Sequence, residues 1–288
     1  TGVQTCALPI WQAAARVMGA SKARVMWDVT VLESLPQTFI GMRAGISFAL
    51  VIVIVAVILF LILKPNSKGI PKIIHQTAPD DESKWPAIWY KCQESWRRNY
   101  PDYEYRMWTD ADLDNFMKEK YPDYWPMYQA YPRKIQRIDV ARYFILYEYG
   151  GIYADMDFEC VRPFMDRIDD SKVGVAESQH IEDNGEELQN ALMVSPEKHP
   201  FWLEVFKDLK EHADDDVGGD AAPIWKTGPY VMIRTGHANP DLMQPLPRES
   251  FAPKTVAFSS GKETFTDEQR ADPNIFTVHH GTFTWGNI

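Results

Sequence analysis

The sequence is poor in cysteine, with only three residues in 288. This scarcity excludes a small scaffold held together by disulfides. Without histidines at ligand spacing, the cysteines do not predict a zinc site either. For Cys92 and Cys160, the two that lie in the folded part, the spacing leaves open whether they form one disulfide or remain two thiols.

Positive charge is also scarce, because 30 Lys and Arg stand against 40 Asp and Glu, which gives a net charge of −10. An acidic chain has no electrostatic field that would collect a phosphate backbone, so we expect no nucleic-acid partner. With 45% hydrophobic residues the chain is too apolar for disorder, and its 288 residues are enough for a sizeable core.

Long hydrophobic runs are absent apart from one, residues 44–63, which are uncharged. At about 1.5 Å per residue this run spans about 30 Å of hydrocarbon, and we predict a transmembrane helix. A buried core helix is the alternative, but residues apolar on every face would leave none for solvent. Basic residues flank both ends, among them Arg43 and Lys64, so charge does not decide the orientation.

The first ten residues, TGVQTCALPI, back-translate with ordinary codons to a common sequencing adapter. We therefore interpret residues 1–10 as an artefact and exclude them from the fold. Residues 11–43 then form an N-terminal tail, residues 64–69 a linker, and residues 70–288 one folded domain.

Apolar residues in the folded part alternate between strand-like and helical spacing. The predicted strands cover residues 70–75, 103–107, 152–154, 173–176, 191–194 and 275–278. The predicted helices cover residues 86–98, a segment capped by Thr109 or Asp110, residues 135–149 closed by a glycine pair, and residues 200–210. Strands alternating with helices predict an α/β domain in which a sheet is layered by helices.

Two aspartates, Asp155 and Asp157, follow the strand at 152–154, where open α/β sheets place their ligands. If the strand geometry continued, both carboxylates would point to the same face and repel one another. A hard divalent cation between them, Mn²⁺ or Mg²⁺, would relieve that repulsion. The pair therefore predicts a metal site that can accept phosphate oxygens and neutralise charge on a departing diphosphate.

Four tracts of the sequence together resemble the sugar-transferring domain of glycosyltransferase family 32. They are residues 70–77 (IPKIIHQT), 103–110 (YEYRMWTD), 137–157 and 279–285 (HHGTFTW). The family includes fungal initiation-specific α-1,6-mannosyltransferases and inositol phosphoceramide mannosyltransferases, and the match covers about residues 70–285. The resemblance implies a GT-A fold, a nucleotide-sugar donor, metal dependence and transfer with retention of anomeric configuration.

The resemblance assigns roles around the aspartate pair. Asp155 and Asp157 match the D-x-D motif of the family, with Asp157 in direct metal contact. Asp139 and Arg142 match an Asp-x-x-Arg that holds hydroxyls of the donor sugar and orients the site, although an intrahelical ion pair is the alternative. Their spacing of three places them on one helical face. Tyr153 matches an aromatic donor-side position and is equally compatible with the core.

The resemblance also assigns residues near the C-terminus. His279 or His280 matches a third element at the metal, and we take His280 as the ligand, because an imidazole can complete the coordination of Mn²⁺. Surface histidines at a strand end are the alternative. Thr284 and Trp285 resemble a Ser-Trp pair that closes on the diphosphate.

Three further residues are candidates by their place in the resemblance. His75 and Gln76 lie where the first strand of the family meets the nucleotide, so we expect them on the nucleotide side. Asn190 falls where the family approaches the reacting centre, and we take it as a catalytic candidate.

The resemblance further implies the partners and the location of the protein. GDP-mannose is the favoured donor, and UDP-linked sugars remain possible. The acceptor is expected to be a glycan or a sphingolipid. The chain is expected to be a single-pass type II protein of the Golgi membrane, with residues 11–43 cytoplasmic and the catalytic domain lumenal.

Two other functions compete with this interpretation. A phosphohydrolase of the haloacid dehalogenase type also places D-x-D after a strand, but its motif continues differently from Phe158 and Glu159. An inactive membrane-anchored glycan-binding scaffold would keep the architecture, but both aspartates are intact here.

Overall fold

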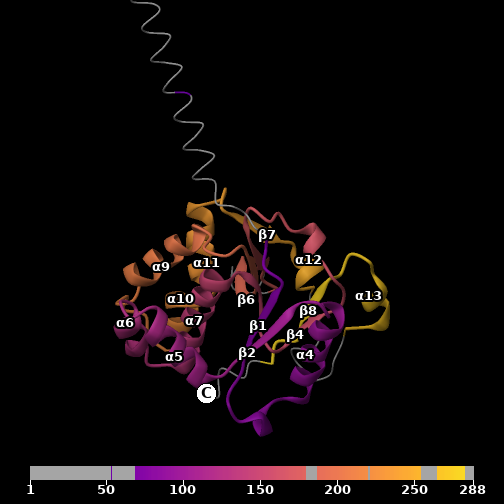
Figure 1. Ribbon diagram of the computed structural model, residues 1–288, viewed down its shortest axis with the longest axis horizontal. Helices are drawn as coiled ribbons and strands as arrows, with labels where there is room; N and C mark the ends of the chain where they lie inside the picture. Colours follow the sequence, from indigo (N-terminus) through magenta and orange to yellow (C-terminus); the bar gives the residue numbers. More distant parts are fainter. Residues whose placement is uncertain (1–52, 54–68, 180–186, 220, 254–264, 283–288) are drawn as a thin grey trace, which may run out of the picture. The chain divides into compact units, whose positions relative to one another are not determined.

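The computed structural model describes residues 53, 69–179, 187–219, 221–253 and 265–282 (Figure 1). The chain divides into two compact units, Thr1–Asn66 and Ser67–Ile288, and the fold described is that of the second. Apart from residue 53, the predicted adapter segment, tail and membrane helix 44–63 lie outside the described residues, as does the linker up to residue 68. Within the described ranges, no helix is long and apolar enough to cross a membrane.

A mixed six-stranded sheet, in the order β2-β1-β3-β6-β5-β7, forms the centre of the domain. The strands are β1 (Ile73–Thr77), β2 (Glu104–Trp108), β3 (Gly151–Ala154), β5 (Val173–Glu177), β6 (Leu188–Ser195) and β7 (Met243–Leu246). β1 pairs in parallel with β2 and β3, and β5 in parallel with β7, whereas β6 lies antiparallel between β3 and β5. A separate two-stranded antiparallel sheet joins β4 (Phe158–Cys160) to β8 (Thr277–His279).

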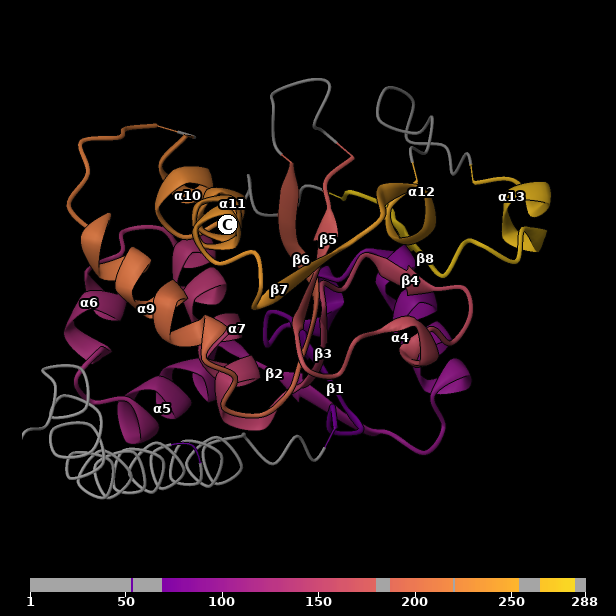
Figure 2. The same cartoon turned by 90° about the horizontal axis from the view of Figure 1, so that it is seen from above.

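Helices cover both faces of the large sheet, as Figures 1 and 2 show. On one side lie α5 (Asp110–Lys120), α6 (Trp125–Ala130), α7 (Lys134–Tyr149), α9 (Phe201–Glu211), α10 (Ala221–Lys226) and α11 (Pro229–Ala238). On the other lie α4 (Ala87–Asn99), α12 (Arg248–Phe251) and α13 (Asp267–Ala271), together with the β4–β8 pair. Short 3₁₀ turns occupy Glu82–Lys84 and Met165–Arg167.

Side chains of the central strands alternate between two hydrophobic cores. On β3, Tyr153 packs into the core on the α7 side, whereas Ile152 and Ala154 pack into the core on the α4 side. On β6, Met193 joins the first core and its neighbours Leu192 and Val194 join the second. A strand buried on both faces in this way requires helices on both sides of the sheet. The predicted α/β fold with a mixed sheet layered by helices is confirmed.

The glycine pair after α7 sets the position of β3. Gly150 caps α7 at φ +61°, and Gly151 begins β3 at φ +93°, a region that side chains with a Cβ rarely adopt. A Cβ on Gly151 would lie 2.4 Å from the carbonyl oxygen of Ile73. Only glycine therefore allows β3 to start directly beside β1, and this start determines where Asp155 lies.

Most predicted elements are observed with bounds shifted by a few residues. The predicted helix at 86–98 is α4, the one at 135–149 is α7, and Thr109 caps α5 through a capping box. The strand at 152–154 ends there, because the amide of Phe158 donates to the carbonyl of Asp155 at 2.9 Å and closes a turn. The two aspartates therefore lie in a turn between β3 and β4, directly after the strand predicted at residues 152–154. Cys160 carries a buried free thiol, so it does not belong to a disulfide.

Candidate active site

The turn that carries Asp155 and Asp157 is held by main-chain contacts from three parts of the chain. The Asp155 amide donates to the Ala191 carbonyl on β6 at 2.8 Å, and the Gln76 side-chain amide donates to the Asp155 carbonyl at 3.2 Å. The His280 amide donates to the Asp157 carbonyl at 2.9 Å. Because these contacts come from β1, from β6 and from the segment after β8, the turn is positioned before any ligand binds.

The Asp155 carboxylate has an aromatic hydroxyl and a guanidinium beside it. The Tyr153 hydroxyl donates to Asp155 Oδ1 at 2.7 Å, and Thr77 Oγ1 lies 2.9 Å from the same hydroxyl. Arg142 Nη1 lies 3.2 Å from Asp155 Oδ1. Burial raises the pKa of Asp155, Arg142 opposes that rise, and the negative charge of Asp157 adds to it. The net effect is a raised pKa, of which burial is the main cause.

The Asp157 carboxylate is held by the segment that follows β8. The amide and hydroxyl of Thr282 donate to Asp157 Oδ2 at 2.7 and 2.9 Å, and His279 Nε2 lies 3.4 Å from Asp157 Oδ1. Burial by itself would raise the pKa of Asp157, but the His279 ring and the Thr282 donors outweigh it and lower the pKa below its usual range. Asp157 is therefore the carboxylate that stays ionised most readily.

A buried polar network lies on the α7 side of Asp155. Arg142 Nη2 lies 3.1 Å from Asp139 Oδ1, and Arg142 Nη1 donates to the Asn190 carbonyl at 2.9 Å. Asn190 Nδ2 donates to Asp139 Oδ1 at 2.9 Å, and Thr227 Oγ1 donates to Asp139 Oδ2 at 3.2 Å. The side chains of Arg142 and Asp139 are only 3% and 7% exposed, so their ion pair is not a solvated surface pair. The network brings together Asp139, Arg142 and Asn190, the three residues named as catalytic candidates from the sequence.

The protonation state of Asp139 leads to a prediction about stability. Burial, opposed by Arg142, raises the pKa of Asp139 from 3.8 to about 7. Between these pH values the folded protein binds a proton at Asp139 that the unfolded chain has released. This group therefore lowers the free energy of unfolding as pH rises through the window, by up to about 1.4 kcal/mol per pH unit.

Asp139→Asn is expected to remove that contribution. Urea unfolding of both proteins between pH 4 and pH 7, with EDTA present, measures the effect as the difference between their slopes. Equal slopes for the two proteins across this pH window would contradict a buried Asp139 with a raised pKa.

Two residues of the network were missed at the level of sequence. The Tyr143 hydroxyl accepts from Asn190 Nδ2 at 2.9 Å and donates to the Thr227 carbonyl at 2.7 Å. Tyr143 lies four residues after Asp139, on the same face of α7, and that spacing was a usable signal. Thr227 is 88 residues from Asp139 along the chain, and no local pattern points to it.

The histidines after β8 lie differently from the expectation. His280 Nε2 lies 2.9 Å from Glu159 Oε2, and Arg270 also contacts Glu159. It is His279 that faces Asp157, with its ring stacked on Phe158 at 4.5 Å between centroids. Consecutive residues of an extended strand point to opposite faces, so only one of the two histidines can approach the aspartates. His280, predicted at the metal, thus contacts Glu159, and His279 is the histidine that lies beside the aspartates.

The expected nucleotide contacts of His75 and Gln76 are also corrected. Both side chains are completely buried. Trp108 Nε1 donates to His75 Nδ1 at 3.1 Å, and His75 Nε2 lies 3.0 Å from the Gly150 carbonyl. The Tyr105 hydroxyl donates to Gln76 Oε1, and Gln76 Nε2 donates to the Asp155 carbonyl. Their polar atoms are used within the protein, so both residues brace the site. Tyr153 is likewise completely buried and braces Asp155.

The aspartate pair fits a divalent cation by its chemistry. Both residues offer carboxylate oxygens, the ligand type that Mn²⁺ and Mg²⁺ take. A bound cation would also oppose the burial, and the weaker effect of Asp157, that raise the pKa of Asp155. Among the described residues, no group of three or more His, Cys, Asp and Glu side chains is arranged to hold a metal ion. Thr284 and Trp285, expected at the diphosphate, lie outside the described residues.

Comparison with known proteins identifies one region of this chain, which includes Asp139, Arg142, Asp155 and Asp157. Residues 86–174 match the family described as the glycosyltransferase sugar-binding region containing the DXD motif. Over 167 residues the chain is 38% identical to inositol phosphoceramide mannosyltransferase 3 of Schizosaccharomyces pombe, which covers 58% of this chain and 45% of that protein. Over 113 residues it is 33% identical to the initiation-specific alpha-1,6-mannosyltransferase of Candida albicans, which covers 38% of this chain and 29% of that protein.

The chain therefore spans less than half the length of these two relatives. Among solved structures, it is similar to the UDP-bound glycosyltransferase domain of the YGT toxin, at a TM-score of 0.46 and 9% identity over 62% of this chain and 80% of that one. The resemblance predicted from the sequence motifs is confirmed by the family match and by the mannosyltransferase relatives.

Proposed function

Because residues 86–174 carry a glycosyltransferase sugar-binding region with its D-x-D motif, we propose that the domain is a metal-dependent, retaining mannosyltransferase of GT-A fold. The observation that carries the proposal is the position of Arg142, which contacts both Asp155 of the motif and Asp139 of the buried network. One guanidinium thereby links Asp155, which would hold the cation at the diphosphate, to Asp139, which would hold hydroxyls of the sugar.

In the proposed reaction, a hydroxyl oxygen of the acceptor bonds to the anomeric carbon of the donor sugar as the bond from that carbon to the diphosphate oxygen breaks. The nucleoside diphosphate leaves with the electron pair and takes the proton of the acceptor hydroxyl. Asp139 and Asn190, fixed by Arg142 and Tyr143, orient the hydroxyls of the sugar. Their fixed positions lower the cost of bringing the reacting atoms together.

Asp155 and Asp157 would hold Mn²⁺ or Mg²⁺, with His279 beside Asp157. When bound, the cation neutralises negative charge that develops on the departing diphosphate. Thr282 donates two hydrogen bonds to Asp157, which favour the ionised carboxylate and fix its orientation.

GDP-mannose is the donor we propose first, since both relatives described above are named as mannosyltransferases. UDP-linked sugars are the alternative donors. The names of the same relatives favour a sphingolipid such as inositol phosphoceramide, or a glycan, as acceptor. The apolar run at 44–63 supports anchoring to a membrane by one helix. With the family resemblance, it supports a type II protein of the Golgi membrane with its catalytic domain in the lumen.

A donor screen tests the proposed function. The whole chain in detergent, supplied with Mn²⁺ and a panel of GDP- and UDP-sugars, is expected to use GDP-mannose at least about tenfold better than any other donor in kcat/KM. EDTA should abolish transfer and added Mn²⁺ should restore it.

Other outcomes of the screen point to the competing functions. Phosphate release without sugar transfer would favour a phosphohydrolase, and silence with every donor would favour an inactive glycan-binding scaffold.

A further inference from the structure

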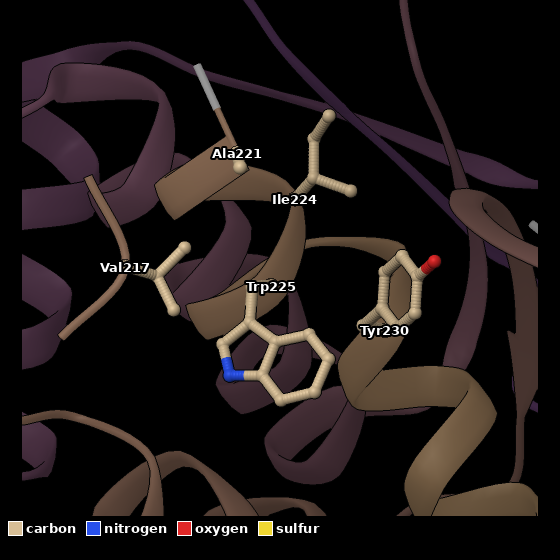
Figure 3. Close-up of a pocket in the computed structure, with 5 residues that line it drawn as sticks. All are labelled: Val217, Ala221, Ile224, Trp225 and Tyr230. Atoms are coloured by element: carbon tan, nitrogen blue, oxygen red, sulfur yellow. The ribbon is translucent and has the colours of Figure 1, made fainter. Parts of the chain in front are cut away.

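A pocket of about 370 Å³ opens between α10 and α11, outside the network already described (Figure 3). It is lined by Val217, Ala221, Ile224, Trp225 and Tyr230. The side chains of Ile224, Trp225 and Tyr230 are half-buried, so part of each faces the opening. The lining is apolar, and two aromatic rings form much of it.

The aromatic wall of this pocket is held in place before any ligand enters. Trp225 Nε1 donates to Asp215 Oδ2 at 2.7 Å, and the Arg234 guanidinium lies 4.9 Å from the indole ring. Arg234 is itself held by both oxygens of Asp208, at 2.6 and 2.8 Å. The centroid of the Tyr230 ring lies 5.3 Å from that of Trp225, at an interplanar angle of 38°. Fixed rings of this kind bind with little loss of side-chain entropy.

The pocket is tied to the donor-sugar side of the site through Thr227, which lies two residues after Trp225 and three before Tyr230. Its hydroxyl donates to Asp139 and its carbonyl accepts from Tyr143. Thr227 is therefore a neighbour of the lining residues along the chain and also contacts the residues expected around the donor sugar. Thr227, which lies between the lining residues Trp225 and Tyr230, thus connects this segment to Asp139 by one hydrogen bond.

We propose that this pocket binds the acceptor, and that it takes the acceptor as a six-membered polyol ring, either a sugar or a cyclitol. This inference rests on the proposed function. A polyol ring has an apolar C–H face that can stack on an aromatic ring and hydroxyl edges that stay in water, which suits an apolar, half-open pocket. An acyl chain would need an enclosed channel longer than the five lining residues provide. The diphosphate of the donor would be held elsewhere, by the cation at Asp155 and Asp157.

Tyr230→Leu and Trp225→Leu test this assignment, because each keeps the pocket apolar and removes one stacking ring. The probes are inositol 1-phosphate, which represents a sphingolipid headgroup, and methyl α-mannoside, which represents a glycan end. We expect calorimetry to show a rise of about five- to tenfold in the Kd of one probe, and kinetics to show a matching rise in the acceptor KM. Donor hydrolysis in the absence of acceptor should not change.

Tyr90→Leu is the matched control, because Tyr90 is an exposed tyrosine on α4, on the other side of the sheet. The probe that binds the wild-type protein identifies the acceptor as a glycolipid or as a glycan. Unchanged Kd values in both variants, or binding of neither probe, would overturn the assignment. An equal loss of GDP binding would also overturn it and identify a base pocket. If a probe binds but no sugar is transferred, the pocket is still a binding site and only the proposed function is rejected.

Discussion

Asp157→Ala is expected to lower Mn²⁺-dependent sugar transfer by about a thousandfold or more, while the domain remains folded. A metal that stabilises a leaving diphosphate contributes several kcal/mol, and about 4 kcal/mol corresponds to a thousandfold in rate. The family resemblance places Asp157 in direct metal contact, and its lowered pKa keeps the carboxylate ionised for that role. The loss should appear in kcat, with a parallel weakening of Mn²⁺ binding in a titration.

Asp241→Ala serves as the control for this experiment, because Asp241 is exposed and lies between α11 and β7. It should leave both activity and Mn²⁺ binding unchanged. Because Thr282 also depends on Asp157, circular dichroism and thermal unfolding of the variant should accompany the assay. Full activity in a folded Asp157→Ala protein would remove the metal assignment.

Arg142→Met is expected to lower the free energy of unfolding by about 3–5 kcal/mol and to abolish transfer. The substitution leaves Asp139 and Asp155 without the cation that they share, and an uncompensated buried charge is costly. The cost should be smaller at pH 5 than at pH 8, because the buried Asp139, whose pKa is already about 7, can take up a proton at the lower pH. Urea unfolding at the two pH values measures both the size and the sign of this effect.

Arg142→Lys should recover part of the stability and little of the activity. A lysine carries the charge on a single point and cannot reach Asp139, Asp155 and the Asn190 carbonyl together. Arg137→Met is the control on the same helix, since Arg137 is half-buried and donates to the Tyr131 carbonyl at 3.3 Å. A loss of less than about 1 kcal/mol in Arg142→Met, equal to that of Arg137→Met, would mean that the network does not depend on its cation.

Local patterns were sufficient for the elements that deliver the site. Helical spacing of apolar residues predicted α7, the glycine pair predicted its end, and the short apolar run predicted β3 just before Asp155. The spacing of Asp139 and Arg142 predicted that they share a face of α7, and they do. These features depend on residues within about one or two turns of one another, so the sequence carries them directly.

Contacts between distant segments were not predictable in the same way. Which of His279 and His280 approaches Asp157 depends on how β8 packs against β4. The burial of His75 and Gln76 depends on contacts with Gly150, β2 and the aspartate turn. The role of Thr227 depends on the packing of α10 against α7. No spacing along the chain contains this information.

The sequence by itself determined the layered α/β architecture, the aspartate pair at a strand end and the helix that faces it, because periodicity and turn chemistry are local. Only the tertiary structure decided which groups surround each carboxylate, and hence that burial and Asp157 raise the pKa of Asp155 whereas His279 and Thr282 lower that of Asp157. The physical reason is that desolvation and charge–charge interaction act through space. Their strength is set by packing between segments that lie far apart in the chain.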